Sequence, residues 1–178
     1  MTVRPHNGIT PTIAAGAYVD PSAVVIGRVT IGEDASIWPM AVVRGDVHEV
    51  HIGARTSIQD GSVLHVTHDS HYAPGGQALI VGADVTVGHR VVLHACTIGN
   101  SCLIGMGSVV LDDVTIEDFV ILGAGSLVSP GKTLQSRGLY VGSPARRTRD
   151  LKDEEIAFLA YSAQHYVTLK NEYLRVDG

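Results

Sequence analysis

Aromatic residues are scarce in this sequence: they make up 5% of its 178 residues, although 45% of the chain is hydrophobic. This scarcity indicates a narrow core in which Ile, Val and Leu stack and rings do not fit. Basic residues are outnumbered too, and the net charge of −5 leaves no basic patch for binding nucleic acid. Because a long apolar run and a signal peptide are lacking, we expect a cytoplasmic protein that does not engage a membrane.

What the sequence does contain is an aliphatic residue at nearly every sixth position. Two positions before it usually stands a small or β-branched residue, and a glycine often follows it, as in Ile31-Gly32. A period of six with this pairing is typical of a hexapeptide-repeat β-helix, in which residues two apart on each short strand face inward. The aliphatic positions are Ile13, Val19, Val25, Ile31, Ile37, Val43, Ile52, Ile58, Leu64, Val81, Val87, Leu93, Ile98, Ile104, Val110, Ile116, Leu122 and Val128.

These eighteen positions predict the architecture of residues 1–140. Three hexads make one triangular coil, so the positions correspond to about six coils of an all-β, parallel β-helix. A β-sandwich is disfavoured because its strands vary in length and hairpin turns interrupt them.

Two insertions interrupt the repeat. Val43 and Ile52 are nine positions apart, so three extra residues are expected to protrude around Val47 to Val50. Residues 66–78, read as VTHDSHYAPGGQA, are polar and contain Pro-Gly-Gly. They predict a loop that leaves the β-helix and returns.

Cysteine occurs only twice, at Cys96 and Cys102. Both occupy the small inward position of successive hexads. We therefore interpret them as buried packing residues and not as redox or metal-binding groups.

Residues 141–178 have a different pattern. A turn at Val141-Gly142-Ser143-Pro144 is followed by acidic residues, which favour a helix start. We expect this helix to lie along one face of the β-helix or to cross to a neighbouring subunit. The acidic residues are Asp150, Asp153, Glu154 and Glu155, and the apolar helical face comprises Leu151, Ile156, Leu159, Ala163, Val167 and Leu174.

The repeat predicts where three histidines lie on the coils. His65 and His94 each follow an inward leucine on the same face, one coil apart, so their backbones are predicted to lie about 4.8 Å apart with both rings outward. Arg44 belongs to the same outward file one coil earlier. His89 lies around a corner, five extended residues or about 16 Å before His94, and we expect it not to meet the other two within one chain. In a threefold oligomer, two imidazoles of one chain and one of the next would bind zinc and leave the fourth position to water.

Three runs of residues, in order along the chain, resemble the γ-class carbonic anhydrase family. They are Val43-Arg44-Gly45-Asp46, the run from Gln59 to His65 (QDGSVLH), and the run from Gly88 to Gly99 (GHRVVLHACTIG). The resemblance extends to Gly142-Ser143-Pro144 and the C-terminal helix. It implies a left-handed β-helix that assembles as a homotrimer with three metal sites between subunits. The implied reaction is reversible hydration of carbon dioxide to bicarbonate by metal-bound hydroxide.

The resemblance also implies roles for single residues. His65, His89 and His94 match the metal ligands, which would take zinc, or iron or cobalt. Gln59 and Asp60 match residues that orient the hydroxide and its proton. Arg44 and Asp46 match a pair at the subunit interface and bicarbonate site, where an ion pair across subunits would form. A purely structural salt bridge would need the same geometry. The four non-ligand candidates are Arg44, Asp46, Gln59 and Asp60.

The chain also departs from the family pattern. The glutamate that shuttles protons from an acidic loop has no counterpart between Val66 and Ala78, where His68 is the candidate relay because histidine titrates near neutrality. The site-facing asparagine of the C-terminal helix has no clear match, and Gln164 or His165 occupies that region. These departures place the chain with the shorter, loop-poor relatives.

Two alternatives remain open. Hexapeptide-repeat acyltransferases share the scaffold and use a histidine as general base beside coenzyme A in a subunit groove. A non-catalytic, trimeric accessory protein would keep the metal without the reaction. Bound metal distinguishes the first alternative, and a hydration assay distinguishes the second.

Overall fold

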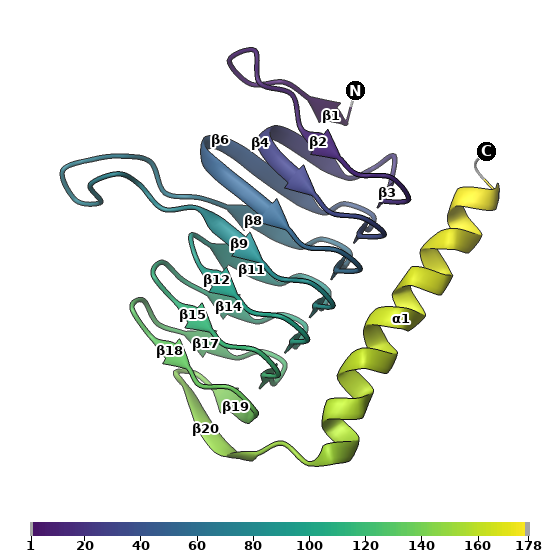
Figure 1. Cartoon of the computed structure of the whole chain (residues 1–178). Coiled ribbons are helices and arrows are strands. Elements are labelled where there is room, and N and C mark those ends of the chain that lie inside the picture. Colours follow the sequence, from purple (N-terminus) through teal and green to yellow (C-terminus); the bar gives the residue numbers. More distant parts are fainter. Residues whose placement is uncertain (1, 177–178) are drawn as a thin grey trace.

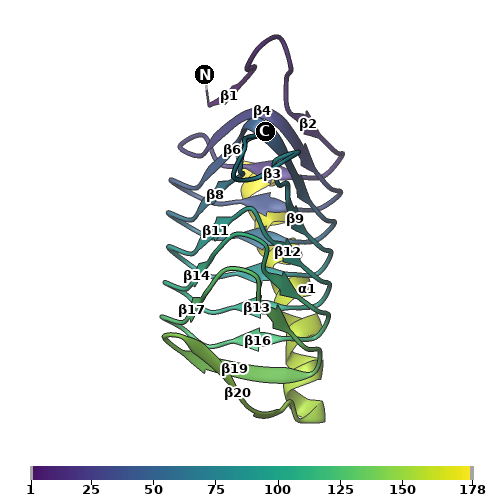
Figure 2. The same ribbon diagram turned by 90° about the vertical axis from the view of Figure 1, so that its left-hand side faces the viewer.

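The six-residue repeat folds into a parallel β-solenoid with one long helix along its side (Figure 1). The computed structural model describes residues 2 to 176. Its short strands stack in three columns, one for each side of a coil, and Figure 2 shows the coils one above another with the helix behind them. All strands pair in parallel except at the last layer.

The first column, which we call the helix face, lies under the helix α1 (Asp153–Val176), which contacts strands β5 and β10. It contains β3 (Tyr18–Val19), β5 (Ser36–Ile37), β7 (Ser57–Ile58), β10 (Thr86–Val87), β13 (Leu103–Ile104), β16 (Ile121–Leu122), β19 (Gly138–Gly142) and β20 (Ala145–Asp150).

The other two columns form one continuous sheet, because β4 (Val24–Ile31) and β6 (Val42–Ile52) run around the corner between them. The second column, the imidazole face, contains β1 (Val3–Arg4), the first halves of β4 and β6, β8 (Val63–His65), β11 (Val92–His94), β14 (Val109–Val110) and β17 (Leu127–Val128). The third column contains β2 (Thr12–Ile13), the second halves of β4 and β6, β9 (Leu79–Val81), β12 (Thr97–Ile98), β15 (Thr115–Ile116) and β18 (Thr133–Leu134).

The solenoid has more turns than the six predicted. Seven parallel layers lie on each face, and the antiparallel β20 adds an eighth to the helix face, which gives about eight turns. The sequence count stopped early, because Leu134 and Tyr140 continue the six-residue spacing beyond Val128 and are buried. The predicted domain boundary at residue 140 therefore falls inside β19, and the ring of Tyr140 joins the core cluster at this end.

The interior follows the repeat. Every predicted inward position from Val25 to Val128 is buried, as are the small residues two positions earlier. Each buried Ile, Leu or Val contributes about 1.5–3 kcal/mol of hydrophobic stabilisation. Ile13 and Val19 are the exceptions because they lie at the open N-terminal end, where Ile13 is 38% exposed and Val19 is half-buried. Cys96 and Cys102 are buried and unpaired, as predicted.

Glycine follows the inward residue because successive coils approach closely at one corner. A Cβ on Gly53 would lie 2.4 Å from the carbonyl carbon of Gly82 in the next coil. Any side chain here would push the coils apart, so the glycine preserves the hydrogen bonds between layers.

Both insertions lie where the sequence placed them, with two corrections. The pairing of β4 with β6 shifts between Gly27 and Val29, so the extra residues protrude, but Val50 itself is buried. Val66 is also buried, because it continues the inward alternation of β8. The loop after it projects from the solenoid between β8 and β9 (Figure 1), and the backbones of Thr67 and Gln77 close its neck.

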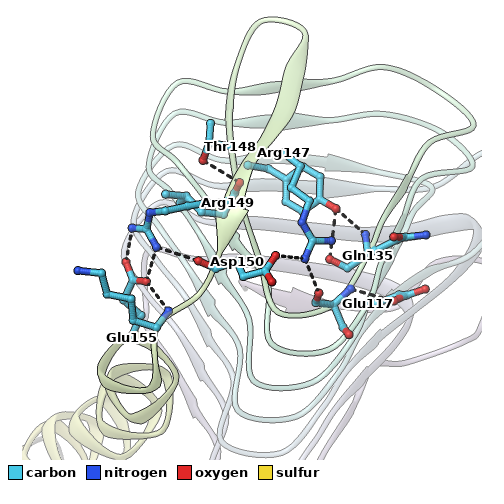
Figure 3. Close-up of polar contacts among 11 residues, drawn as sticks. Glu117, Gln135, Arg147, Thr148, Arg149, Asp150 and Glu155 are labelled. Atoms are coloured by element: carbon cyan, nitrogen blue, oxygen red, sulfur yellow. Dashed lines mark hydrogen bonds and ion pairs between the residues drawn. The ribbon is translucent and has the colours of Figure 1, made fainter.

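The C-terminal segment contains a hairpin as well as the predicted turn and helix. β19 and β20 pair around Ser143-Pro144, and α1 then begins at Asp153. Glu155 accepts a hydrogen bond from the backbone N–H of Lys152 at 2.9 Å and pairs with both terminal nitrogens of Arg149 (Figure 3). Hydrogen bonding and charge from Arg149, with the Lys152 hydrogen bond, lower the pKa of Glu155 to about 2. The acidic first turn therefore caps the helix and ties it to the solenoid.

The helix packs through most of its predicted apolar face. Leu151, Leu159, Ala163 and Val167 are buried, whereas Ile156 is half-buried and Leu174 is exposed.

Near the C-terminal end of α1, aromatic side chains make the contacts with the solenoid. The Trp38 and Tyr173 ring centroids lie 5.2 Å apart, and Lys170 is buried with its Nζ 2.6 Å from Asp34. Tyr18, Trp38 and Tyr173 thus pack together between α1 and the helix face, outside the aliphatic interior. Residues 177 and 178 of the predicted segment, like residue 1, lie outside the described residues. Among residues 2 to 176, no helix is long and apolar enough to cross a membrane.

Candidate metal centre

Two imidazoles lie side by side on the imidazole face. β8 and β11 pair in parallel with Leu64 opposite Leu93 and His65 opposite His94. Because each leucine points into the core, each following histidine points outward. The two ring centroids are 5.3 Å apart, and the His65 Nδ1 is 3.2 Å from the His94 Nε2. The stacking predicted from the repeat is therefore confirmed.

Asp46 holds the ring of His65. Its Oδ1 lies 3.0 Å from the His65 Nε2, and its Oδ2 accepts a hydrogen bond from the Arg44 guanidinium. Burial would raise the pKa of Asp46, but hydrogen bonds from His65 and Arg44 and the charge of Arg44 outweigh it and lower this pKa to about 2. Arg44 and Asp46 form an ion pair within one chain, because both residues lie on β6, two positions apart. The ion pair expected across subunits stays a prediction.

Asp112 holds the ring of His94 in the same way, and sequence reasoning missed it. Its Oδ1 lies 2.7 Å from the His94 Nδ1, and its Oδ2 accepts a hydrogen bond from the Thr67 hydroxyl at 2.5 Å. Burial would raise the pKa of Asp112, but the hydrogen bonds from Thr67 and His94 outweigh it, so this pKa lies below its usual value. A signal was available, because Leu93 pairs with Val110 in the next coil, and Asp112 follows Val110 by two positions.

The tautomers follow from these carboxylates. Both aspartates are ionised at neutral pH and carry no proton, so the His65 Nε2 and the His94 Nδ1 must be the N–H donors. Burial and the charge of Arg44 lower the pKa of His65, whereas the hydrogen bond and charge of Asp46 raise it. The net effect is a lowered pKa, so the ring of His65 is neutral. In neutral rings the remaining nitrogens, His65 Nδ1 and His94 Nε2, carry lone pairs.

Two lone pairs that face each other across 3.2 Å repel unless a cation or a proton lies between them. Two nitrogens bound to one tetrahedral zinc ion at about 2.05 Å lie about 3.3 Å apart. The observed spacing therefore fits two ligands of a single metal ion, and both rings have the carboxylate partners that metal-binding histidines usually have.

His89 lies elsewhere in the chain. It follows β10 on the helix face, where its Nδ1 is 3.0 Å from the Asp60 Oδ2, and both side chains are about half exposed. No group of three or more His, Cys, Asp or Glu side chains within residues 2 to 176 could hold a metal ion. His89 therefore does not join His65 and His94 within one chain, in agreement with the spacing argument.

A cavity of about 350 Å³ lies beside His89, between α1 and strands β10, β13 and β16. Gln59 and Tyr166 lie on its wall, together with apolar side chains such as Met106 and Phe158. Burial and the charge of Asp60 raise the pKa of Tyr166, and its hydrogen bond with Gln59 opposes them. Gln59 thus lies at this cavity and Asp60 lies beside it through its contact with His89, on a different face from His65 and His94.

The remaining candidates have few contacts. His68 is exposed on the loop, and no hydrogen bond or ion pair among residues 2 to 176 includes it. Asp69, beside it, accepts a hydrogen bond from the backbone N–H of Gly75 at 2.7 Å, which shapes the loop. Gln164 and His165 are exposed on α1, where the His165 ring stacks on Tyr161. The structure therefore brings together His65, His94, Arg44 and Asp46, and separately His89, Asp60 and Gln59.

Known proteins resemble this chain over nearly its whole length. The family description "Bacterial transferase hexapeptide (six repeats)" matches residues 10–45 and 95–130. Protein YrdA of Escherichia coli (strain K12) is 56% identical over 172 residues, which cover 97% of this chain and 94% of the relative. Gamma carbonic anhydrase 1, mitochondrial, of Arabidopsis thaliana is 44% identical over 159 residues, which cover 89% of this chain but 58% of the relative.

A solved structure agrees with these relatives. The crystal structure of a hexapeptide transferase family protein from Anaplasma phagocytophilum superimposes with a TM-score of 0.86 at 40% sequence identity. The match covers 95% of this chain and 96% of that chain. Both the repeat and the overall arrangement of the coils and helix are therefore shared with a known group of proteins.

Proposed function

This chain belongs to the hexapeptide-repeat, left-handed β-helix family that includes YrdA and the γ-carbonic anhydrases, and from this premise we propose that it catalyses reversible hydration of carbon dioxide to bicarbonate. The proposed enzyme is a homotrimer with metal sites between its subunits. Zinc is the proposed metal, with iron or cobalt as alternatives, because a three-imidazole site accepts each of them.

One observation carries this proposal. The His65 Nδ1 and the His94 Nε2 face each other at 3.2 Å, and each ring donates its other N–H to an ionised aspartate. A general base needs one such histidine, whereas two lone pairs aimed at one point suit a metal ion. His89 of a neighbouring subunit would complete the ligand set, since within one chain it lies on another face.

A divalent ion with three imidazole ligands supplies an activated water near neutral pH. The protein's own groups then have separate tasks. Asp46 and Asp112 hold the two ligand rings in the required tautomers, and Asp60 does the same for His89. Arg44 provides a positive charge for the bicarbonate that forms, and Gln59 offers an amide at the cavity wall to orient the water.

The proton released in the reaction must leave the site. Hydration of carbon dioxide yields bicarbonate and one proton, and the loop 66–78 offers no glutamate to carry it. His68 is the proposed relay because it is exposed, although the structure gives it no hydrogen bond to the site. We therefore expect proton export to limit the rate unless buffer takes the proton.

One observation favours acyl transfer as a second candidate. His89 is oriented by Asp60 through its Nδ1, beside an apolar cavity of about 350 Å³. A histidine held by a carboxylate can act as a general base for an attacking amine or hydroxyl. The facing pair of His65 and His94 has no task in that mechanism, which is why we rank it second.

The test is stopped-flow hydration of carbon dioxide by the zinc- and iron-loaded protein at several imidazole-buffer concentrations. We expect catalysis above the buffer background, with a rate that rises with buffer concentration. Background rates with every metal would reject the enzyme and leave a metal-binding accessory protein. Turnover of acetyl-coenzyme A by metal-free protein would instead support the acyl-transfer reading.

A further inference from the structure

The two ligand histidines have supports of the same design but different charge. His65 bonds to Asp46, whose second oxygen is held by the cationic Arg44. On the neighbouring coil His94 bonds to Asp112, and the second oxygen of that carboxylate is held by the neutral hydroxyl of Thr67. In each case one carboxylate oxygen fixes the ring, and the other oxygen is itself fixed.

We propose that Asp112 and Thr67 are positioning residues that hold His94 with its Nε2 directed at the metal. This inference rests on the proposed function, because it assigns His94 as a ligand. Neither residue belongs to the sequence motifs that resemble the carbonic anhydrase family, and both act through the ring of His94.

Asp112 can hold only one tautomer of His94. An ionised carboxylate accepts hydrogen bonds and donates none, so a proton on the His94 Nδ1 is stabilised at 2.7 Å from the Asp112 Oδ1. The lone pair is thereby fixed on the Nε2, which lies 3.2 Å from the His65 Nδ1. The alternative tautomer would place two acceptors against each other on the Asp112 side.

Thr67 fixes Asp112 without neutralising it. The hydrogen bond from the Thr67 hydroxyl to Asp112 spans 2.5 Å. The Thr67 backbone N–H donates to the Gln77 carbonyl at 3.1 Å, and the Thr67 carbonyl accepts from the Gln77 N–H at 2.9 Å. Thr67 is therefore a fixed point at the neck of an otherwise exposed loop.

The charge difference has a chemical consequence. Arg44 neutralises much of the negative charge on Asp46, whereas Thr67 leaves the charge of Asp112 for His94. A full negative charge behind an imidazole strengthens it as an electron-pair donor. His94 is therefore the stronger donor of the two rings, and its support makes a larger contribution to metal affinity.

The experiment compares isosteric variants of full-length protein. Metal affinity is measured by competition of zinc with a chromogenic chelator, for Asp112→Asn, Thr67→Val and Thr67→Ser. We expect Asp112→Asn to weaken zinc binding by about 10- to 100-fold, and Thr67→Val to weaken it less. Thr67→Ser keeps the hydroxyl and should bind zinc like the wild type.

Asp113→Asn is the matched control, because it makes the same chemical change one residue along. Asp113 is exposed with a φ of 59°, a conformation that asparagine tolerates, and among residues 2 to 176 no hydrogen bond or ion pair joins its side chain to His94. Zinc affinity should be unchanged in this variant. An equal loss in Asp113→Asn and Asp112→Asn would reduce the effect to net charge and overturn the positioning role.

A second readout separates this inference from the metal site itself. Nitrogen chemical shifts of ¹⁵N-histidine in metal-free protein report which ring nitrogen carries the proton. We expect a single tautomer of His94, protonated at Nδ1, in wild type and Thr67→Ser, and a mixture of tautomers in Asp112→Asn. If wild-type protein binds no zinc but shows this pattern, the proposed function fails and the positioning role stands. Unchanged tautomer and affinity in Asp112→Asn would overturn the positioning role alone.

Discussion

The lower coils of this solenoid, residues 98–128, and its middle coils, residues 43–93, have the same kind of aliphatic interior, but only the middle coils contain insertions. From Ile98 to Val128 the inward residues follow one another at six-residue intervals without insertion. Between Val43 and Leu93 two insertions interrupt the same spacing. Every predicted site residue except His94 comes from the middle segment or its insertions, and His94 follows it directly. The regular repeat therefore forms the scaffold, and most of the candidate site residues lie where insertions interrupt it.

The interruptions act through geometry. Asp46 is the first residue of the protrusion in β6, where the register with β4 shifts, and it faces His65. Thr67 begins the long loop, and its hydroxyl reaches Asp112, which follows β14 on the coil after His94. Without these insertions, the chain would turn directly into the next strand after Gly45 and after Val66. The lower coils contribute Asp112 to the support of His94, and β13 and β16 to the wall of the cavity beside His89.

The largest effect should come from removing a ligand in the middle coils. His94→Ala deletes a nitrogen of the proposed metal site while the buried aliphatic residues still hold the coils together. We expect elemental analysis to find about one metal ion per chain in wild-type protein and almost none in the variant, with an unchanged circular dichroism spectrum.

His71→Ala is the control for this loss. It removes an exposed loop imidazole whose ring contacts that of Tyr72. Equal loss of metal in both variants would mean that binding by surface histidines, and not a built site, explains the metal content.

A smaller effect, on stability alone, should come from the lower coils. Ile116 is fully buried in β15, and its neighbour Thr115 faces outward in the same strand. Ile116→Ala should lower the free energy of unfolding by about 2–5 kcal/mol because it leaves a cavity. Thr115→Ala should change it by less than about 1 kcal/mol. Denaturant titration at one fixed chain concentration measures both.

Leu93→Ala sharpens the contrast between the two regions. Leu93 is as buried as Ile116 but immediately precedes His94. The replacement should lower both stability and zinc affinity, whereas Ile116→Ala should leave zinc affinity unchanged. If both variants weaken zinc binding equally, the lower coils are coupled to the site and the contrast breaks.

The smallest effect concerns the two cysteines, which lie at the junction of the regions. Burial raises the pKa of the Cys102 thiol to about 12, and it raises that of Cys96 as well. At pH 8 almost no thiolate exists, so folded protein should react with Ellman's reagent at a negligible rate. In guanidinium both thiols should react at once. Rapid reaction of either thiol in the folded protein would show that these coils open.

Most of the fold could be predicted from the sequence because the repeat is local. Each hexad specifies its own strand and its own inward residues, so the core from Val25 to Val128 followed from counting. The count failed at both ends. At the N-terminal end, Ile13 and Val19 keep the spacing but are not fully covered. At the C-terminal end, the count omitted Leu134, although it keeps the spacing, and Tyr140, which is not aliphatic. The β19–β20 hairpin carries charged residues on exposed strands that show no repeat.

Less of the candidate site could be predicted, because its contacts join residues whose spacing depends on the insertions. His65 and His94 could be placed as neighbours since both follow inward leucines. Asp112 and Thr67 were missed because a single aspartate and a loop threonine resemble ordinary surface residues. The pairing of Arg44 with Asp46 inside one chain depends on the protrusion in β6, whose path the spacing alone did not specify.

The most direct test of the proposed shared site is complementation between inactive chains. His65→Ala and His89→Ala chains, unfolded and refolded together, should form mixed trimers in which one interface has all three imidazoles. Random mixing of equal amounts would restore about one site in four. His65→Ala mixed with His94→Ala should restore none, because both losses fall on the chain that supplies the stacked pair. Zinc bound per chain after gel filtration is the measurement. Recovery near one quarter in the first mixture alone is the predicted result, and no recovery there, with wild-type protein still binding zinc, would contradict the shared site.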